Sequence, residues 1–168
     1  YEDGILITFK SRLEGNILKI KQIQTTYGQV DEDRRYEIDI KGKKSTNYAN
    51  DSNIFGRAIG QNQGIQFPIA RAYAQMKAAE LMVYHAARLY EAGRPIGEEA
   101  NTAKLLAADA SWAAAEACVQ THGGFGFAEE YDVERKFREA RLYQVAPIST
   151  NLILSYLAEH VLGMPRSY

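Results

Sequence analysis

The segment Gln120–Phe127 reads Gln-Thr-His-Gly-Gly-Phe-Gly-Phe, and its residue types suit contact with a ligand. Glycine permits positive φ angles and lets another molecule come close to the backbone. The segment is therefore either a helix C-cap with a loop, or a surface for a phosphate-bearing cofactor. The glycines alone favour the cap. They follow a predicted helix, whereas the dinucleotide-binding fingerprint follows a strand and opens a helix.

Two further segments carry polar groups at suggestive positions. Residues 54–67 are punctuated by glycine, rich in side-chain amides, and lead into a predicted long helix. Amides and a helix N-terminus suit phosphate groups and purine edges, although a plain loop with N-capping is the alternative. Residues 138–145 read Arg-Glu-Ala-Arg-Leu-Tyr-Gln-Val and form the other segment.

Other chemistries have weaker support. His85, His122 and His160 are far apart and have no His or Cys at ligand spacing, so we predict structural roles for them and no metal site. No Gly-x-Ser-x-Gly nucleophile motif occurs. Lys104 is interpreted as a solvated or snorkelling residue rather than a Schiff-base lysine. Cys118 lies in an apolar helical run and is interpreted as a buried small apolar residue.

Composition narrows the class of protein. The 168 residues carry a formal charge of −1, which gives no reason to expect nucleic acid or an acidic membrane as a partner. A single cysteine excludes an internal disulfide and favours a reducing compartment, so we expect a cytoplasmic protein. No run of about 18 apolar residues predicts a transmembrane helix, and no signal peptide is visible. Tyr1 stands where a starting Met is usual, so a trimmed chain or a fragment is one expectation.

The elements around these segments divide into two kinds. Residues 1–44 alternate apolar and polar side chains, as half-buried strands do, and predict a three-stranded β-meander. The alternating apolar positions are Ile5, Ile7 and Phe9; Leu18 and Ile20; and Tyr36, Ile38 and Ile40. Gly15-Asn16 predicts the first turn, and Tyr27-Gly28 marks the second connection. Residues 45–53 are polar, rich in turn formers, and interpreted as a linker.

Residues 54–168 have helical periodicity instead. Apolar residues recur at spacings of three and four over 66–91, with Pro68 in the first turn and Gly93 at the end. These are Ile65, Ile69, Ala72, Met76, Ala79, Val83, Ala86 and Tyr90. An alanine-rich helix is predicted over 98–121, ended by Gly123, and a short one over 133–142. A last helix begins after Ser149, a natural N-cap, and runs to Gly163. The fold class is thus mainly α, an antiparallel helical bundle preceded by a small β-meander.

Taken together, residues 54–168 resemble the C-terminal helical domain of the acyl-CoA dehydrogenase family. The motifs occur in the family's order. They are Phe-Gly-Arg-x-Ile-Gly-x-x-Gln from Phe55, Gln-x-x-Gly-Gly-x-Gly-Phe from Gln120, a Glu-Tyr turn at Glu130, and Arg-Glu-Ala-Arg-Leu-Tyr-Gln from Arg138. The resemblance does not extend to residues 1–50.

The resemblance implies an FAD-dependent oxidoreductase of fatty acid metabolism that desaturates acyl-CoA thioesters between Cα and Cβ. Electrons then pass to an electron-transferring flavoprotein. The C-terminal bundle of such enzymes forms the core of a homo-oligomer, a dimer or tetramer, and reaches the FAD of a neighbouring subunit. By position, Phe55 and Gln63 are flavin contacts, and Gln120, Gly123 and Gly124 cradle the adenosine diphosphate. Ser149 and Asn151 fall where the family has a Thr and a polar side chain near the FAD.

Three departures accompany the resemblance. Pro147 stands where many members carry the catalytic Glu, so no catalytic residue is assigned. The first helix of the domain, which carries the base in some members, should precede Phe55, where the strands and linker are predicted instead. Ser52 occupies the position of the family's pyrophosphate-binding Arg, and Arg57 matches a more peripheral basic position. The chain alone is therefore expected not to dehydrogenate acyl-CoA.

Two alternative functions stay open. One is a non-catalytic helical module that self-associates through its alanine-rich faces, which Pro147 and the missing first helix favour. The other is a related flavoenzyme with different chemistry, such as an acyl-CoA oxidase. Flavin content distinguishes the module from the dehydrogenase portion, and oxygen consumption distinguishes the oxidase.

Overall fold

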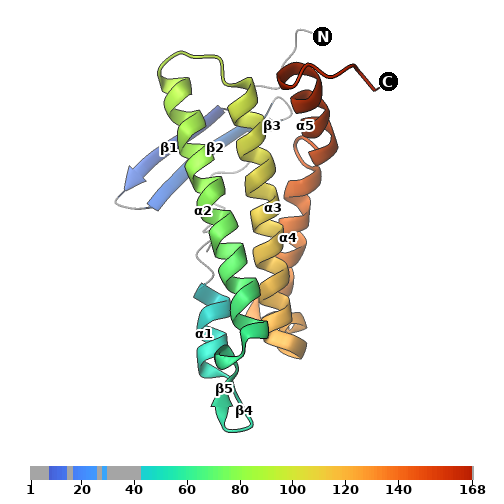
Figure 1. Ribbon diagram of the computed structural model, residues 1–168. Coiled ribbons are helices and arrows are strands. Elements are labelled where there is room, and N and C mark those ends of the chain that lie inside the picture. Colours follow the sequence, from blue (N-terminus) through green and yellow to red (C-terminus); the bar gives the residue numbers. More distant parts are fainter. Residues whose placement is uncertain (1–7, 15–16, 26–27, 30–42, 168) are drawn as a thin grey trace. The chain divides into compact units, whose positions relative to one another are not determined.

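The computed structural model describes residues 8–14, 17–25, 28–29 and 43–167 (Figure 1). Contacts within the chain divide it into two units, Tyr1–Ile38 and Asp39–Tyr168. The first unit contains a small β-sheet and the second contains the helices, and each is described by itself.

The sheet consists of β1 (Thr8–Glu14), β2 (Ile17–Thr25) and the two-residue β3 (Gly28–Gln29), in that order and antiparallel. Glu14 lies opposite Ile17, and a bulge falls between Lys10 and Ser11. The predicted second strand is confirmed, because β2 contains Leu18 and Ile20, whereas β1 contains Phe9 of the predicted first strand and runs on to Glu14. Gly28, predicted in a connection, instead pairs with Thr25. The predicted strand at 36–40, Ile5, Ile7 and the Gly15-Asn16 turn lie outside the described residues.

The predicted linker at 45–53 is wrong, because helix α1 (Lys43–Asp51) occupies most of it. Ser45 and Ala49 are buried and Tyr48 is half-buried. Their spacing places them on one face of the helix, and α1 packs against the helix α3 (Gly97–His122). The buried side chains at this contact are small, so a polar sequence can pack there as a helix. The composition of the segment therefore did not indicate a helix.

Helix α2 (Gln63–Glu91) contains the predicted stripe, with Ala72, Met76, Ala79 and Ala86 buried and Tyr90 exposed. It begins three residues earlier than predicted, so Pro68 lies in the second turn, where its missing N–H leaves the Gly64 carbonyl without its helical donor. The helix ends at a Schellman motif around Gly93 (φ 68°), as predicted. There the amides of Gly93 and Arg94 donate to the carbonyls of Tyr90 and Leu89.

The alanine-rich helix α3 runs antiparallel to α2 (Figure 1). Met76 and Ala79 of α2 form a buried cluster with Ala110 of α3, against which Leu106 and Ala107 pack. Alanine at these positions allows the two helices to approach closely. The short connection between the helices places the far end of α3 beside the start of α2.

Two short 3₁₀ segments, η2 (Gly123–Phe127) and η3 (Glu129–Tyr131), lead from α3 into helix α4 (Val133–Val145). After a turn come α5 (Thr150–Tyr156) and a π-helical segment, η4 (Leu157–Val161). Val133 and Ile153 are almost fully buried, Ile153 being 1% exposed. The predicted antiparallel helical bundle is confirmed. No helix among the described residues is long and apolar enough to cross a membrane.

Candidate functional site

The predicted cofactor residue Phe55 lies at the tip of a small hairpin. Strands β4 (Asn53–Ile54) and β5 (Arg57–Ala58) pair antiparallel, with Ile54 opposite Arg57. Phe55 and Gly56 connect them, both at positive φ, 55° and 77°. Positive φ at both central positions is the type I′ pattern, which usually takes Asn or Gly. An aromatic residue in this region is strained, and Phe55 is also fully exposed.

Hydrogen bonds attach the hairpin to the start of α2. Arg57 donates through Nη2 to Asn62 Oδ1 at 2.7 Å, and Asn62 Nδ2 donates to the Ile59 carbonyl at 3.0 Å. Gln66 Nε2 donates to the Gly60 carbonyl at 2.7 Å. Gln63, the first residue of α2, is exposed. The hairpin that carries Phe55 is therefore fixed to Asn62, the residue before the predicted contact Gln63.

The three glycines after α3 are glycine for different reasons. Gly123 caps α3 with φ 57° and ψ −132°, a conformation that side-chain-bearing residues avoid. A Cβ on Gly126 would lie 2.8 Å from the Val119 carbonyl oxygen, so the packing of the chain requires it. Gly124 has neither cause, because its φ is not positive and a Cβ there would meet nothing within 4 Å. Gly123 and Gly124 are both exposed, so nothing in the described part of the chain covers this backbone.

Aromatic side chains hold the bend in place. His122, only 4% exposed, stacks on Tyr48 of α1 with ring centroids 4.0 Å apart. Its Nδ1 lies 2.8 Å from the Cys118 carbonyl oxygen. Tyr131 meets both rings edge-on and also contacts Phe125. The bend is therefore fixed by α1, α3 and η3 together.

The turn between α4 and α5 carries the other predicted residues. Ser149 caps α5 as predicted, its Oγ accepting from the Leu152 amide at 3.3 Å. Asn151 is exposed in the first turn of α5. Pro147, at the position of the family's catalytic Glu, is also exposed and offers no proton acceptor. Thr150 Oγ1 donates to the Gln144 carbonyl at 3.1 Å and ties α5 to the end of α4.

The structure thus separates the predicted cofactor residues into two groups, at the two ends of α4 (Figure 1). The hairpin, the start of α2 and the bend after α3 share one end of the bundle, which we call the bend end. Ser149 and Asn151 lie beyond the opposite end of α4, whose 13 residues span about 20 Å. One chain therefore does not gather all of the predicted residues around one point.

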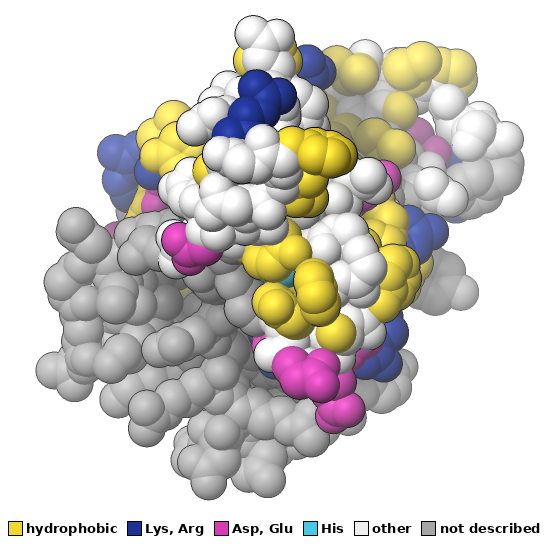
Figure 2. Space-filling model, turned by 90° about the horizontal axis from the view of Figure 1, so that it is seen from below, with side chains coloured by type: hydrophobic (Ala, Val, Ile, Leu, Met, Phe, Trp, Pro, Cys, Tyr) yellow, Lys and Arg dark blue, Asp and Glu magenta, His cyan; other side chains and the backbone are white. Residues whose placement is uncertain are grey.

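The bend end has the surface character of a binding site. In Figure 2, which views the bundle from below, hydrophobic side chains lie among polar and backbone atoms, with acidic side chains beside them. The exposed large hydrophobic residues of the hairpin, the start of α2 and η2 are Ile54, Phe55, Phe67, Phe125 and Phe127. Four are phenylalanines, whose flat rings suit stacking on an aromatic ligand.

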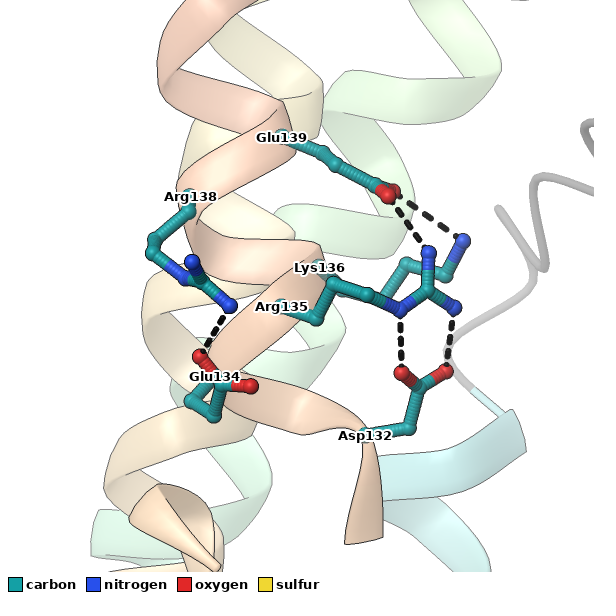
Figure 3. A network of polar contacts seen from close by, with 6 residues as sticks. All are labelled: Asp132, Glu134, Arg135, Lys136, Arg138 and Glu139. Atoms are coloured by element: carbon teal, nitrogen blue, oxygen red, sulfur yellow. Dashed lines mark hydrogen bonds and ion pairs between the residues drawn. The ribbon is translucent and has the colours of Figure 1, made fainter. Parts of the chain in front are cut away.

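The start of α4 carries charges that pair with one another (Figure 3). Arg135 binds Asp132 through two hydrogen bonds, of 2.5 and 2.7 Å, and Glu139 through a third, and these partners raise its pKa. Lys136 pairs with Glu139 and Arg138 with Glu134, at 3.2 and 2.8 Å. Arg138 opens the motif Arg-Glu-Ala-Arg-Leu-Tyr-Gln, and its guanidinium is paired within α4. Pairing on the surface of α4 therefore explains Arg138 at the start of the motif without a ligand.

Several other predictions are refined. Cys118 is half-buried rather than buried, with Sγ 3.8 Å from His122 Nδ1. His122 is buried and bonded, as a structural histidine should be, whereas His85 and His160 are exposed. Lys104, interpreted as solvated or snorkelling, is half-buried and donates to the Tyr143 carbonyl of α4. No group of three possible metal ligands occurs within the described part of the chain.

Sequence reasoning missed the packing roles of residues that shape these surfaces, namely Tyr48, Tyr131, Lys104 and Asp109. Tyr48 lies in the segment interpreted as a linker. Tyr48 and Ala49 follow Ser45 at spacings of three and four, and this was an available helical signal. Tyr131, Lys104 and Asp109 act through packing between elements, for which the sequence gives no local signal.

The helical unit matches a known domain. A sequence model of the acyl-CoA dehydrogenase C-terminal domain covers residues 43–162, so the match includes the whole segment that was predicted as a linker. Helix α1 belongs to the matched region and stands before Phe55, where the domain's first helix was expected but thought missing. The bundle is thereby assigned to the class of acyl-CoA dehydrogenase C-terminal domains.

Named relatives and solved structures agree. The chain is 39% identical over 127 residues to acyl-CoA dehydrogenase FadE12 of Mycobacterium tuberculosis, covering 74% of this chain and 33% of that protein. It is 36% identical over 114 residues to the mitochondrial short/branched chain specific acyl-CoA dehydrogenase of Rattus norvegicus, covering 68% and 26%. Butyryl-CoA dehydrogenase from Megasphaera elsdenii superposes with a TM-score of 0.70 at 30% identity, covering 73% and 32%.

This chain belongs to the acyl-CoA dehydrogenase family. It spans about a third of the length of the curated relatives named above, or less.

Proposed function

We propose that this chain is the FAD-contacting C-terminal portion of an acyl-CoA dehydrogenase, an enzyme that desaturates acyl-CoA thioesters. FAD, when bound, supplies the redox chemistry, and the residues of this chain hold and orient it. The bend after α3 would receive the adenosine diphosphate, with Gln120, Gly123 and Gly124 against it. Phe55 and Gln63 would contact the cofactor from the hairpin side.

One observation carries this proposal, which is the bare backbone at Gly124. Neither its φ nor its packing requires glycine, while Gly123 and Gly126 on either side have reasons within the chain. A position kept without a side chain on an exposed surface suits the close approach of a pyrophosphate. The strained, exposed ring of Phe55 supports the same conclusion, because backbone strain concentrates at functional sites.

The separation of the two residue groups favours a cofactor shared between subunits. The bend end would contact one FAD, and Ser149 with Asn151 would contact a second. Exposed hydrophobic side chains along α2 support association between copies. They are Phe67, Tyr73, Leu81, Tyr84 and Tyr90. We therefore expect a homo-oligomer, a dimer or tetramer, measurable by light scattering.

The decisive test is FAD binding by this chain, measured as the quenching of flavin fluorescence. Gly124→Leu places a side chain over the proposed pyrophosphate position and should abolish binding of both FAD and ADP. Ala92→Leu, an exposed change at the other end of the bundle, should leave binding unchanged. A colourless protein that takes up no FAD would overturn the proposal and favour the non-catalytic self-association module.

Turnover is expected to be absent in the isolated chain. Pro147 cannot accept the α-proton of an acyl-CoA, and Ser52 cannot neutralise a pyrophosphate as Arg does. A panel from butyryl- to palmitoyl-CoA with a dye acceptor tests this expectation, and turnover of any member contradicts it. Oxygen consumption would point to an oxidase instead. In a whole enzyme, acyl-CoA would be the substrate and an electron-transferring flavoprotein the partner.

A further inference from the structure

Two charged residues of α3 contact consecutive residues near the end of α4. The Lys104 ammonium donates to the carbonyl oxygen of Tyr143. Asp109, on the same helix, accepts through Oδ1 from Gln144 Nε2 at 3.1 Å. Lys104 thus holds the backbone at Tyr143, and Asp109 holds the side chain of Gln144.

These contacts satisfy a need of α4. The last four carbonyls of a helix have no partner within it. In α4, Leu142 accepts from the Ala146 amide at 2.9 Å, Gln144 accepts from Thr150 Oγ1, and Tyr143 accepts from Lys104. The last turn of α4 contains no basic residue. Lys104 therefore supplies, from a neighbouring helix, the cation that stabilises a helix C-terminus.

The same contacts act on the turn that follows. Because Thr150 bonds the Gln144 carbonyl, α5 is linked to the residue that Asp109 holds. Ser149 in turn caps α5. The segment Gln144–Asn151 is thus tied to α3 at its start and to α5 at its end. A contact to the backbone and a contact to a side chain together limit both sliding and rotation of α4 against α3.

We propose that Lys104 and Asp109 are positioning residues that set the turn Gln144–Asn151 for contact with the flavin. The proposal rests on the proposed function, which assigns Ser149 and Asn151 to a cofactor. Neither Lys104 nor Asp109 touches the cofactor in this arrangement, and both act through Tyr143 and Gln144. Burial lowers the pKa of Lys104, consistent with a lysine committed to an internal contact rather than to solvent.

The test compares Lys104→Met and Asp109→Ala with the conservative Lys104→Arg and Asp109→Asn. Lys136→Met, which removes a partly exposed lysine of α4, is the matched control. Amide hydrogen exchange is measured along the chain, together with FAD affinity. In Lys104→Met and Asp109→Ala we expect exchange over 145–152 to quicken about tenfold while α2 keeps its protection. FAD affinity should fall about tenfold, and both conservative variants should restore most of it.

Unchanged exchange over 145–152, or an equal increase throughout α2 and α3, would overturn the proposal, because positioning predicts a local effect. Faster local exchange with unchanged FAD affinity would overturn the link to the flavin. If the unaltered chain takes up no FAD, the proposed function fails. The exchange profile then still decides whether Lys104 and Asp109 hold the turn.

Discussion

Tyr48 and His122 are 74 residues apart in the chain, and their rings stack with centroids 4.0 Å apart and planes 22° apart. The Tyr48 hydroxyl also lies 3.5 Å from the His122 carbonyl oxygen, a long contact. His122 is the last residue of α3, immediately before Gly123. The stack therefore ties α1 to the residue at which the glycine bend begins.

Replacing Tyr48 should separate the roles of its ring and its hydroxyl. Tyr48→Ala removes the stack and the edge contact with Tyr131, so we expect the free energy of unfolding to fall by about 2 kcal/mol. Tyr48→Phe keeps the ring and should change it by less than about 0.5 kcal/mol, because the hydroxyl contact is long. Urea denaturation measures both, and equal losses in the two variants would contradict the primacy of the ring.

Neighbouring glycines of the bend should respond differently to alanine. Gly126→Ala forces a methyl group to within 2.8 Å of the Val119 carbonyl oxygen, a backbone atom that cannot easily move. We expect a loss of about 1–3 kcal/mol, as for other overpacked sites. Gly124→Ala meets open space, and its free energy of unfolding should stay within about 0.5 kcal/mol of that of the unaltered chain. A large loss in Gly124→Ala would show that the chain itself requires this glycine.

The strain at Phe55 predicts a stabilising substitution. Asn tolerates positive φ and is favoured in type I′ turns, so Phe55→Asn should raise the free energy of unfolding by about 1 kcal/mol. Flavin affinity should fall in the same variant, because an exposed aromatic contact is lost. Thermal unfolding with and without FAD measures the two effects. Stability and affinity falling together would mean that the ring supports the fold.

The lowered pKa of Lys104 predicts a pH dependence. Burial, opposed only in part by Asp109, lowers the pKa of Lys104 in the folded state below the unfolded value of 10.5. Between the lowered value and 10.5 the unfolded chain binds more protons, so the contribution of Lys104 to stability increases as pH rises. The unfolding free energy of the unaltered chain minus that of Lys104→Met should therefore increase with pH over this range.

Comparison with a variant is needed because tyrosines titrate at similar pH. The effects of tyrosines far from Lys104 cancel in the difference, and Tyr143→Phe in both proteins removes the titrating hydroxyl of the residue that Lys104 contacts. Lys77→Met is a suitable control, because Glu80 raises the pKa of Lys77 and gives the opposite sign. A difference that does not vary with pH would mean that Lys104 is as well solvated in the folded chain as in the unfolded one.

The long helices were predictable because their local patterns agree with their packing. The stripe through Ala72, Met76 and Ala79 repeats at helical spacing, and Gly93 and Gly123 stop the helices where predicted. Helix α1 was not predictable from composition, since Ser45 and Ala49 pack as small residues rather than as large apolar ones. Its main aromatic contact depends on a residue 74 positions away.

The candidate site was predictable in its parts and partly in its arrangement. Motif order identified Phe55 and the bend after Gln120, and the structure places both at the bend end. The helix predicted over 133–142 already separates Ser149 and Asn151 from the bend, and the structure extends this helix to Val145. The contact of Lys104 with Tyr143 depends on the packing of α3 against α4, which no spacing within either helix encodes.

The tight reversal at Gly93 has a consequence for the order of folding. Because α2 and α3 are neighbours in sequence, their contacts can form one after another outward from the turn, each closing only a slightly longer loop. The stack of Tyr48 on His122 instead closes a loop that contains both α2 and α3, so it must wait until both helices are in place. We therefore expect α2 and α3 to gain protection first during refolding, and the glycine bend to reach its final form last.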